Sequence, residues 1–464
     1  MSAMKEVLIQ TLQGKKAERT PWVPFVGVHG GYLIGENARS YLRSDETLYK
    51  GLREAIIRYQ PDGIPIVFDL QLEAEILGCD LRWAADGPPC VISHPLENRS
   101  FERLPLPTAR SGRIPLIMKT VDRLKAKHPE VALLGLITGP LTLATHLKGT
   151  ELLTQMILEP DAVEVVIAFC IEVAEIMASL YAEKGVELIA VVDPMISQIA
   201  PRTFKRFLLD PYQRLFERIR SMGSLSASFV CGDARKNLSV ISETKPDSLF
   251  VDENVPLAQL RDCAKAAGIS FGGNIPLAQV LFSGSPEKCQ LSAAKCIYES
   301  GGRGHILAPG CDLLYATPER NLAAIGEMVH AVSYRETGAL IASLSAKLPQ
   351  ERMEPYELPD YQNRTTLTID IITLNSRSCA ACQYMVEAVS ALIEDFPNLP
   401  IVWREHSLME TQTLPMIKAF DVKGIPAIVI DGEVTFESVT PAREELLERI
   451  KRALKRHPRI PPQF

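Results

Sequence analysis

The feature that most constrains the fold is an alternation of apolar segments with helix-like segments through the first two thirds of the chain. Eight segments rich in Val, Ile, Leu and Phe fit strands, at residues 22–29, 63–69, 133–139, 188–194, 226–232, 248–253, 269–276 and 305–312. Intervening segments, such as 161–184, 201–221 and 257–267, have helical periodicity. Strands that alternate with helices pair in parallel, and eight such units predict an α/β fold, a (β/α)8 TIM barrel. A doubly wound open sheet competes, but no Gly-rich phosphate loop follows the first strand.

A second, smaller domain is expected after the barrel. Residues 346–364 are rich in proline and lack an apolar period, so they indicate a linker between a barrel over 1–345 and a domain over 365–464. Strands are predicted there at 366–374, 399–406, 425–431 and 433–437, with helices at 379–395, 413–420 and 441–456. The last two strands meet at Asp431-Gly432, a dipeptide favoured in hairpin turns.

Composition narrows the partners and the compartment. A net charge of -6 disfavours nucleic acid, because phosphate binding requires a basic face. Acidic residues interrupt the longest apolar stretch, around residues 163–181, so no membrane span is expected there. A polar, basic stretch follows residues 1–7 in place of an apolar core, so no signal peptide is expected. The ten cysteines are scattered except for one Cys-x-x-Cys, which favours reduced thiols and a cytoplasmic protein.

Most of the predicted strands end in a side chain able to bind a metal or move a proton. These side chains are His29, Asp69, Asp193, Cys231, Asp252 with Glu253, and Cys311. Each alone is readily explained as a helix cap or a core residue. Together they predict an active site at the carboxyl ends of the strands, where such barrels keep their chemistry.

Cys231 and Cys311 are the strongest candidates among these strand-end residues. Two thiolates with nitrogen or oxygen ligands form the tetrahedral, borderline-soft site that zinc prefers. A third ligand is available from the next strand, where period-2 alternation turns either Asp252 or Glu253 inward. The alternative is a pair of inert buried cysteines, which are common in protein cores.

Several segments resemble the uroporphyrinogen decarboxylase superfamily in collinear order over about residues 15–335. They are Phe68-Asp69 with Glu75-Ile-Leu-Gly78, Gly139-Pro-Leu-Thr-Leu-Ala-Thr-His-Leu-Lys-Gly-Thr-Glu151, Asp193-Pro-Met-Ile-Ser197, Ile306-Leu-Ala-Pro-Gly-Cys-Asp312 and Pro318-Glu-Arg-Asn321. The resemblance implies a (β/α)8 barrel, in agreement with the strand count. It also implies one of two chemistries, decarboxylation of a porphyrinogen or methyl transfer between a corrinoid protein and a thiol.

The sequence departs from the decarboxylases at the positions that serve their substrate. The segment after the first strand, residues 27–32, has no arginine to bind propionates, and His146 and Cys311 replace a Tyr and a His of the decarboxylases. Asp69 is shared with them. Decarboxylation is therefore the alternative expectation.

The corrinoid-dependent methyltransferase branch fits better, because its zinc ligands include a His-x-Cys on the fifth strand and a Cys after the eighth. Cys231 and Cys311 stand in those places, whereas Phe229 replaces the histidine. The related cobalamin-independent methionine synthases add a Glu one strand later, which implies Glu253 as a ligand. The resemblance thus implies zinc, a methylated corrinoid on a partner protein and a small thiol substrate, with Asp69, Asp193 and His146 as catalytic residues. A third possibility is a non-catalytic corrinoid-protein-binding or redox chaperone.

The C-terminal domain resembles thioredoxins and glutaredoxins. Cys379-Ala-Ala-Cys382 follows a predicted strand and opens a helix, and Pro426 stands before a hairpin in the place of that family's cis-proline. A helix N-terminus lowers the pKa of a thiol, so Cys379 is expected to attack and Cys382 to resolve the mixed disulfide. The alternative is an adaptor without redox activity.

Overall fold

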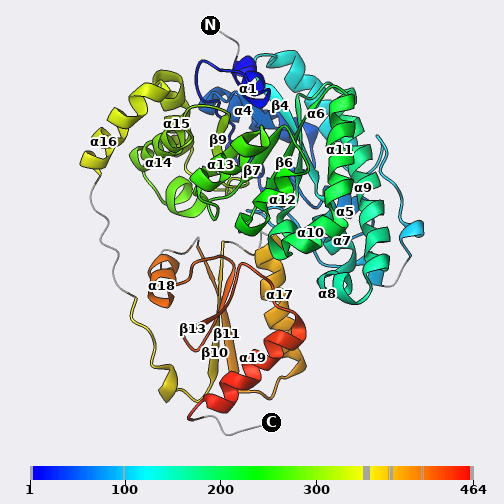
Figure 1. The fold of residues 1–464 in the computed structure, drawn as a ribbon, viewed down its shortest axis with the longest axis vertical. Coiled ribbons are helices and arrows are strands. Elements are labelled where there is room, and N and C mark those ends of the chain that lie inside the picture. The colour runs from blue at the N-terminus through cyan, green and yellow to red at the C-terminus, as the bar shows by residue number, and fades with distance from the viewer. Residues whose placement is uncertain are drawn as a thin grey trace. The chain divides into compact units, whose positions relative to one another are not determined.

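A computed structural model describes residues 4–97, 100–348, 356–374, 376, 380–408, 410 and 412–459 (Figure 1). The chain divides into two compact units, the first formed by Met1–Ile196 and Ala200–Pro349, the second by Gln350–Phe464 together with Ser197–Ile199. No helix within the described ranges is long and apolar enough to cross a membrane.

The first unit is built on a curled sheet of seven parallel strands. Their order is β1 (Gly63–Pro65), β4 (Ala132–Thr138), β5 (Leu188–Val192), β6 (Leu225–Val230), β7 (Ser248–Val251), β8 (Ser270–Ile275) and β9 (His305–Pro309). All of these strands except the first residue of β6 are fully buried, as expected for strands that helices cover on their outer face.

The chain around Trp22 supplies the eighth position and closes the ring. The Val23 N–H donates to the carbonyl of Leu307 on β9 at 2.9 Å, and the Asp62 N–H donates to the carbonyl of Trp22 at 2.9 Å. Seven of the eight predicted strands are therefore present in the predicted order, an isolated bridge at Trp22 takes the place of the eighth, and the predicted barrel fold is confirmed. The strand expected at 22–29 is wrong as a strand: only Trp22 forms a bridge, to Leu307, the residues after it are irregular, and helix α2 (His29–Tyr32) begins at the expected strand end.

Helices alternate with these strands and surround the sheet (Figure 1). The predicted helix at 161–184 is α9 (Pro160–Glu183), and the one at 257–267 is α13 (Leu257–Ala267). The predicted helix at 201–221 is two helices, α10 (Pro201–Phe207) and α11 (Leu209–Ser221), with non-helical dihedral angles at Leu208. The crossover from β1 to β4 is long because it carries α5 (Leu72–Ile76), the antiparallel pair β2 (Leu81–Arg82) and β3 (Cys90–Val91), and α6 (Ile114–Lys127).

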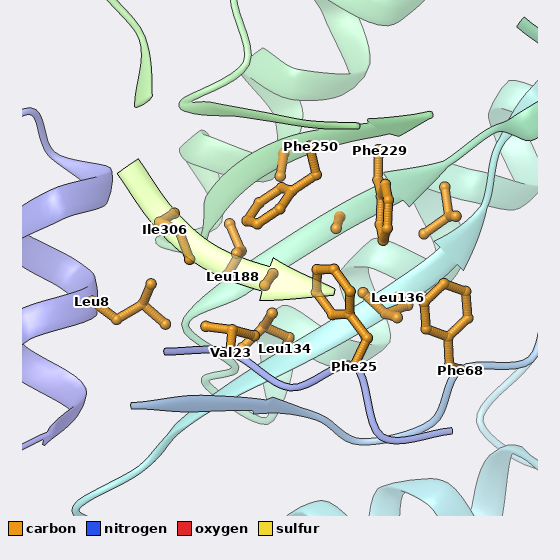
Figure 2. Close-up of a cluster of buried hydrophobic side chains, with 14 of the residues drawn as sticks. Leu8, Val23, Phe25, Phe68, Leu134, Leu136, Leu188, Phe229, Phe250 and Ile306 are labelled. Carbon is orange, nitrogen blue, oxygen red and sulfur yellow. The ribbon is translucent and has the colours of Figure 1, made fainter. Parts of the chain in front are cut away.

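Side chains of the strands fill the barrel interior (Figure 2). Four phenylalanines meet there, and the ring centroid of Phe229 lies 4.8 Å from that of Phe25, 5.8 Å from that of Phe250 and 5.9 Å from that of Phe68. Such an apolar, aromatic interior leaves only the ends of the strands for polar chemistry.

The second unit contains a four-stranded sheet in the order β11 (Ile401–Ser407), β10 (Leu367–Thr373), β12 (Ala427–Ile430) and β13 (Glu433–Glu437). Strands β10 and β11 are parallel, whereas β12 is antiparallel to both of its neighbours. Its helices are α17 (Ala380–Asp395), α18 (Thr413–Phe420) and α19 (Arg443–Arg456). These elements agree with the predicted ones to within two residues.

Candidate functional site

The two predicted metal-binding cysteines lie side by side at the carboxyl ends of β6 and β9. Their Cα atoms are 6.2 Å apart, and their sulfur atoms are joined in a disulfide, although 80 residues separate them in the sequence. Cys231 is buried and belongs to the apolar cluster of the barrel interior, whereas Cys311 packs against this cluster and is partly exposed. The fold thus brings both sulfurs to the end of the aromatic core at which the parallel strands have their carboxyl ends.

Phe229 occupies the position from which a third ligand was expected. It lies two residues before Cys231 on β6, so both side chains point into the barrel. Its side chain is 1% exposed and packs among the other three phenylalanines. The position beside the sulfurs is therefore apolar.

Asp252 and Glu253, the alternative third ligands, contact the residues that flank the cysteines. Asp252 accepts hydrogen bonds from the N–H groups of Gly232, next to Cys231, and of Asn254. Glu253 accepts one from the Leu277 N–H at 3.1 Å, and its carboxylate lies so close to Gly310 that a side chain there would collide with it. Asp252 thus holds the backbone next to Cys231, whereas Glu253 binds the Leu277 N–H and lies against the residue before Cys311.

The pKa values of Asp252 and Glu253 are both raised. Burial raises the pKa of Asp252 well above its usual value, and the neighbouring charge of Glu253 raises it further. Burial likewise raises the pKa of Glu253. Two adjacent buried carboxyls therefore favour sharing at least one proton.

The donors fit zinc in kind but not in number. Two cysteine sulfurs suit zinc, and a zinc site in proteins is ordinarily completed by a third and often a fourth side chain. Among the described side chains, no group of three or more His, Cys, Asp and Glu lies close enough to hold a metal ion. The site therefore consists of two sulfurs, with the Asp252 carboxylate beside Gly232 and the Glu253 carboxylate beside Gly310.

Asp69 lies after β1 in a buried ion pair that the sequence did not predict. Its carboxylate accepts from Nη1 of Arg113 at 2.6 Å, and Nε of the same arginine donates to Glu75 at 2.7 Å. The ring of Trp83 lies over the guanidinium, with 5.1 Å from its centroid to Cζ of Arg113. Asp69 follows β1, which runs parallel to the other strands, so this pair lies near the same end of the barrel as Cys231.

Asp312, directly after Cys311, is a second acidic group at this end that was not singled out. It accepts a hydrogen bond from the Gly27 N–H at 2.9 Å, and a Cβ at residue 27 would overlap its carboxylate. Burial raises its pKa well above the usual value, and the charge of Asp69 raises it further. The Pro-Gly-Cys-Asp turn at the strand end could have revealed Asp312 as a site residue. Arg113 lies in the irregular crossover between β1 and β4, where no comparable sequence pattern marks it.

Asp193 binds the start of a helix. Its two oxygens accept from the N–H groups of Leu141 and Thr142, from the Thr142 hydroxyl and from the Tyr212 hydroxyl, at 2.6–2.9 Å. These contacts fix the N-terminus of α7 (Pro140–Lys148). Burial raises the pKa of Asp193.

The two histidines of interest are both buried and neutral. His146, on α7, is 1% exposed, and burial lowers its pKa to about 3. His29 contacts the Tyr59 hydroxyl with Nε2 at 2.7 Å and the Tyr315 carbonyl with Nδ1 at 2.9 Å, and burial lowers its pKa to about 4. Both ring nitrogens of His29 are thus engaged, which disfavours it as a metal ligand.

In the second unit, the structure describes part of the predicted redox site. Cys379 lies outside the described residues. Cys382 is buried in the first turn of α17, and the Ile425–Pro426 peptide bond is cis, as the resemblance implied.

Comparisons with known proteins agree with this division. The profile of the uroporphyrinogen decarboxylase family matches residues 3–332, and that of a thioredoxin domain matches residues 367–451. A methylcobamide:CoM methyltransferase, MtbA, of Methanosarcina acetivorans is 26% identical over 59% of this chain and 80% of its own length. The methylcobamide:CoM methyltransferase MtaA of Methanosarcina barkeri is 25% identical over 69% of this chain and 96% of its own.

Decarboxylases are also among the relatives. The uroporphyrinogen decarboxylase of Thermus thermophilus is 24% identical over 72% of this chain and 100% of its own length. A solved structure, a methyltransferase from Methanosarcina mazei, superposes with a TM-score of 0.65 at 22% identity, covering 71% of this chain and 99% of its own. This superposition supports the barrel fold.

Proposed function

Because the chain belongs to the uroporphyrinogen decarboxylase family, we propose that its barrel transfers a methyl group between a protein-bound corrinoid and a small thiol. The relatives named as methylcobamide:CoM methyltransferases support this activity. The observation that carries the proposal is the meeting of Cys231 and Cys311 at the end of the barrel where this fold keeps its chemistry.

The charges around the cysteines disfavour the decarboxylase alternative. Four carboxyl groups, Asp69, Asp252, Glu253 and Asp312, lie near this end of the barrel. The guanidinium of Arg113 also lies near this end, but it is already paired with Asp69 and Glu75. These carboxyl groups offer no cation to pair with the many carboxylates of a porphyrinogen, whereas a thiol and a methylcorrin require no such cluster of cations.

Methyl transfer to sulfur requires a thiolate acceptor. The sulfur forms a bond to the methyl carbon as the cobalt–carbon bond breaks, and the electron pair of that bond stays on cobalt. A free thiol has a pKa of about 8.5, so most of it is protonated at neutral pH and must first lose its proton. When bound, zinc supplies this step, because a coordinated thiol is deprotonated.

The proposed ligands are Cys231, Cys311 and Glu253. The first two are reduced in the active state, and the carboxylate of Glu253 lies against Gly310, the residue before Cys311. We assign Asp69 to orienting the acceptor thiol, because it lies at the same end of the barrel. We assign Asp193 and His146 as positioning residues. Asp193 binds the start of α7, and the same helix carries His146.

Zinc content tests the ligand assignment. Reduced protein is expected to bind about one zinc ion per chain, and Cys231→Ser or Cys311→Ser should abolish binding. Phe229→His adds a nitrogen donor on the face that carries Cys231, so zinc should bind at least about tenfold more tightly. Elemental analysis and competition with a chromogenic chelator measure both effects.

The matched control is Phe216→His, which adds a histidine at another fully buried site, on α11. It should leave the zinc affinity unchanged. Metal-free reduced wild-type protein, with no gain from Phe229→His, would refute the zinc site while leaving methyl transfer open.

An assay with methylcobalamin tests the function. The reduced protein is expected to accelerate loss of the methyl group to an added thiol, seen as the absorbance change of cobalt, and to leave uroporphyrinogen unchanged. Turnover of the porphyrinogen would favour the decarboxylase. Binding of a corrinoid protein without either reaction would favour the non-catalytic role.

The thioredoxin-like domain completes the proposal as a tethered dithiol. Zinc-binding thiolates lose their metal when they are oxidised, and a CxxC pair on the same chain acts at a high effective concentration. We assign attack to Cys379, resolution to Cys382 and the role of the cis-proline to Pro426, as the resemblance to thioredoxins implies.

A further inference from the structure

Two tyrosines at the carboxyl ends of the barrel strands form the outer part of a stack of aromatic rings. They are Tyr32, the last residue of α2, and Tyr315, which follows β9 and Cys311. We propose that Tyr32 and Tyr315 contact the edge of the corrin ring, and that they select an edge with neutral amides over one with carboxylates. This inference rests on the proposed function, because it names the part of the corrinoid substrate that the barrel recognises.

Both tyrosines lie at the end of the barrel that holds the cysteine pair. The chain segments that lead to them meet there, because the Gly27 N–H donates to the Asp312 carboxylate at 2.9 Å. The two rings also meet, with centroids 5.5 Å apart at an interplanar angle of 77°. The chain from Cys311 to Tyr315 spans at most about 14 Å. A large macrocycle that presents its cobalt to the sulfurs can therefore reach both rings with its edge.

Hydrogen bonds and buried rings hold the two tyrosines in place. The ring of His29 stacks with both Tyr59 and Tyr32, at 5.9 Å between centroids in each pair and at interplanar angles of 17° and 22°. Nε2 of His29 contacts the Tyr59 hydroxyl at 2.7 Å, and its Nδ1 contacts the Tyr315 carbonyl at 2.9 Å. The Tyr315 hydroxyl donates to the Glu36 carbonyl at 2.9 Å. Rings that are fixed before a ligand arrives reduce the entropy cost of binding.

Exposure increases outward along this stack. His29 and Tyr59 are both 0% exposed, whereas Tyr32 is 42% exposed and Tyr315 is partly exposed. A tyrosine supported by buried rings presents a large apolar face beside a hydroxyl that can donate or accept a hydrogen bond. Such a surface suits a ligand edge in which apolar groups alternate with polar, uncharged ones.

The charges around the stack also suit a neutral ligand edge. Burial lowers the pKa of His29 to about 4, so the stack carries no positive charge at neutral pH. Burial raises the pKa of Tyr315, and the nearby charges of Asp86 and Glu36 raise it further, so its hydroxyl stays protonated. The edge of a cobalamin corrin carries methyl groups and uncharged amides, which rings and hydroxyls can contact. Carboxylates on that edge would require cations instead.

The sequence of this segment is consistent with the same selection. Residues 27–32 contain no arginine, the residue type that binds propionates in the decarboxylases that the chain resembles. Tyr32 is the exposed residue of these six. The chain therefore presents an uncharged ring where a carboxylate-binding barrel would present a cation.

Corrin binding, measured without methyl transfer, tests the contact. The full-length protein is dialysed to equilibrium against cobinamide, a corrin that keeps its amides, and the corrin absorbance gives the Kd. We expect Tyr32→Ala to weaken binding at least about tenfold, because a truncated aromatic contact at a recognition site costs more than about 1.4 kcal/mol. Tyr32→Phe keeps the ring and should lose less affinity than Tyr32→Ala.

The matched control is Tyr298→Ala. Tyr298 is 56% exposed and lies at the end of α14 (Pro286–Glu299), the helix that precedes β9, so it stands at the amino ends of the strands. Its replacement should leave the Kd for cobinamide unchanged. Circular dichroism confirms that each variant is folded.

Tyr32→Arg tests the selection between amides and carboxylates. Arginine at this exposed position supplies a cation, so the variant should bind cobyrinic acid, a corrin with free carboxylates, at least about tenfold more tightly than the wild type does. It should bind cobinamide more weakly than the wild type. Both corrins are compared with the same axial ligands on cobalt.

Three results would overturn the inference. They are no binding of cobinamide to the wild type, equal binding to the wild type and Tyr32→Ala, and no gain in binding of cobyrinic acid by Tyr32→Arg. A protein that binds cobinamide through Tyr32 but moves no methyl group would refute only the proposed methyl transfer. Normal methyl transfer with unchanged corrin binding in Tyr32→Ala would refute only this inference.

Discussion

Cys231→Ser and Cys311→Ser are each expected to lower kcat/KM for methyl transfer from methylcobalamin to a thiol by roughly 1,000-fold. Metal-assisted activation is worth several kcal/mol, and about 4 kcal/mol corresponds to three powers of ten in rate. The two sulfurs act as one site, so each single replacement should cost nearly as much as the double replacement. The cobalt absorbance change under reducing conditions provides the rate.

Cys263→Ser is the matched control, because this cysteine is partly exposed on α13, outside the strand ends. It should keep the wild-type rate. Circular dichroism of each variant separates lost chemistry from lost folding. If either single variant of the barrel pair retained more than about a tenth of the wild-type rate, the pair would not be the site of the proposed reaction.

The barrel could be predicted because its buried strands are short apolar segments at regular spacing. Burial on both faces makes such strands almost continuously apolar, and the helices between them supply the second periodicity. The discrepancies come from local geometry. At the expected first strand only Trp22 pairs with β9, although the segment is apolar, and helical periodicity cannot reveal the interruption at Leu208 that divides 201–221 into two helices.

The meeting of candidate site residues could be predicted where they stand at strand ends and not where it depends on tertiary packing. Parallel strands bring their carboxyl ends to one edge, which is why Cys231 and Cys311 could be paired from sequence alone. Arg113 has no such position, since it comes from an irregular crossover and reaches Asp69 only through the fold. The contacts of Glu253 with Gly310 and Leu277 were equally hidden, because they depend on how three strand ends converge.

Arg113→Met is expected to lower the free energy of unfolding of the barrel by about 3–5 kcal/mol. The substitution keeps an unbranched side chain of similar length but leaves the Asp69 carboxylate, whose side chain is 0% exposed, without its cation. Urea unfolding followed by tryptophan fluorescence measures the change. A Trp403→Phe background confines the signal to Trp22 and Trp83, the tryptophans of the barrel.

Two variants distinguish the loss of a buried ion pair from a general effect of losing arginine. Arg206→Met removes an exposed pair with Glu164, in which both side chains are about half exposed, and should cost less than about 1 kcal/mol. Arg113→Met/Asp69→Asn removes both charges, so it should be clearly less destabilised than Arg113→Met alone. If the double variant were as unstable as the sum of the single ones, the guanidinium would stabilise this part of the barrel mainly by packing on Trp83 and not by compensating the charge of Asp69.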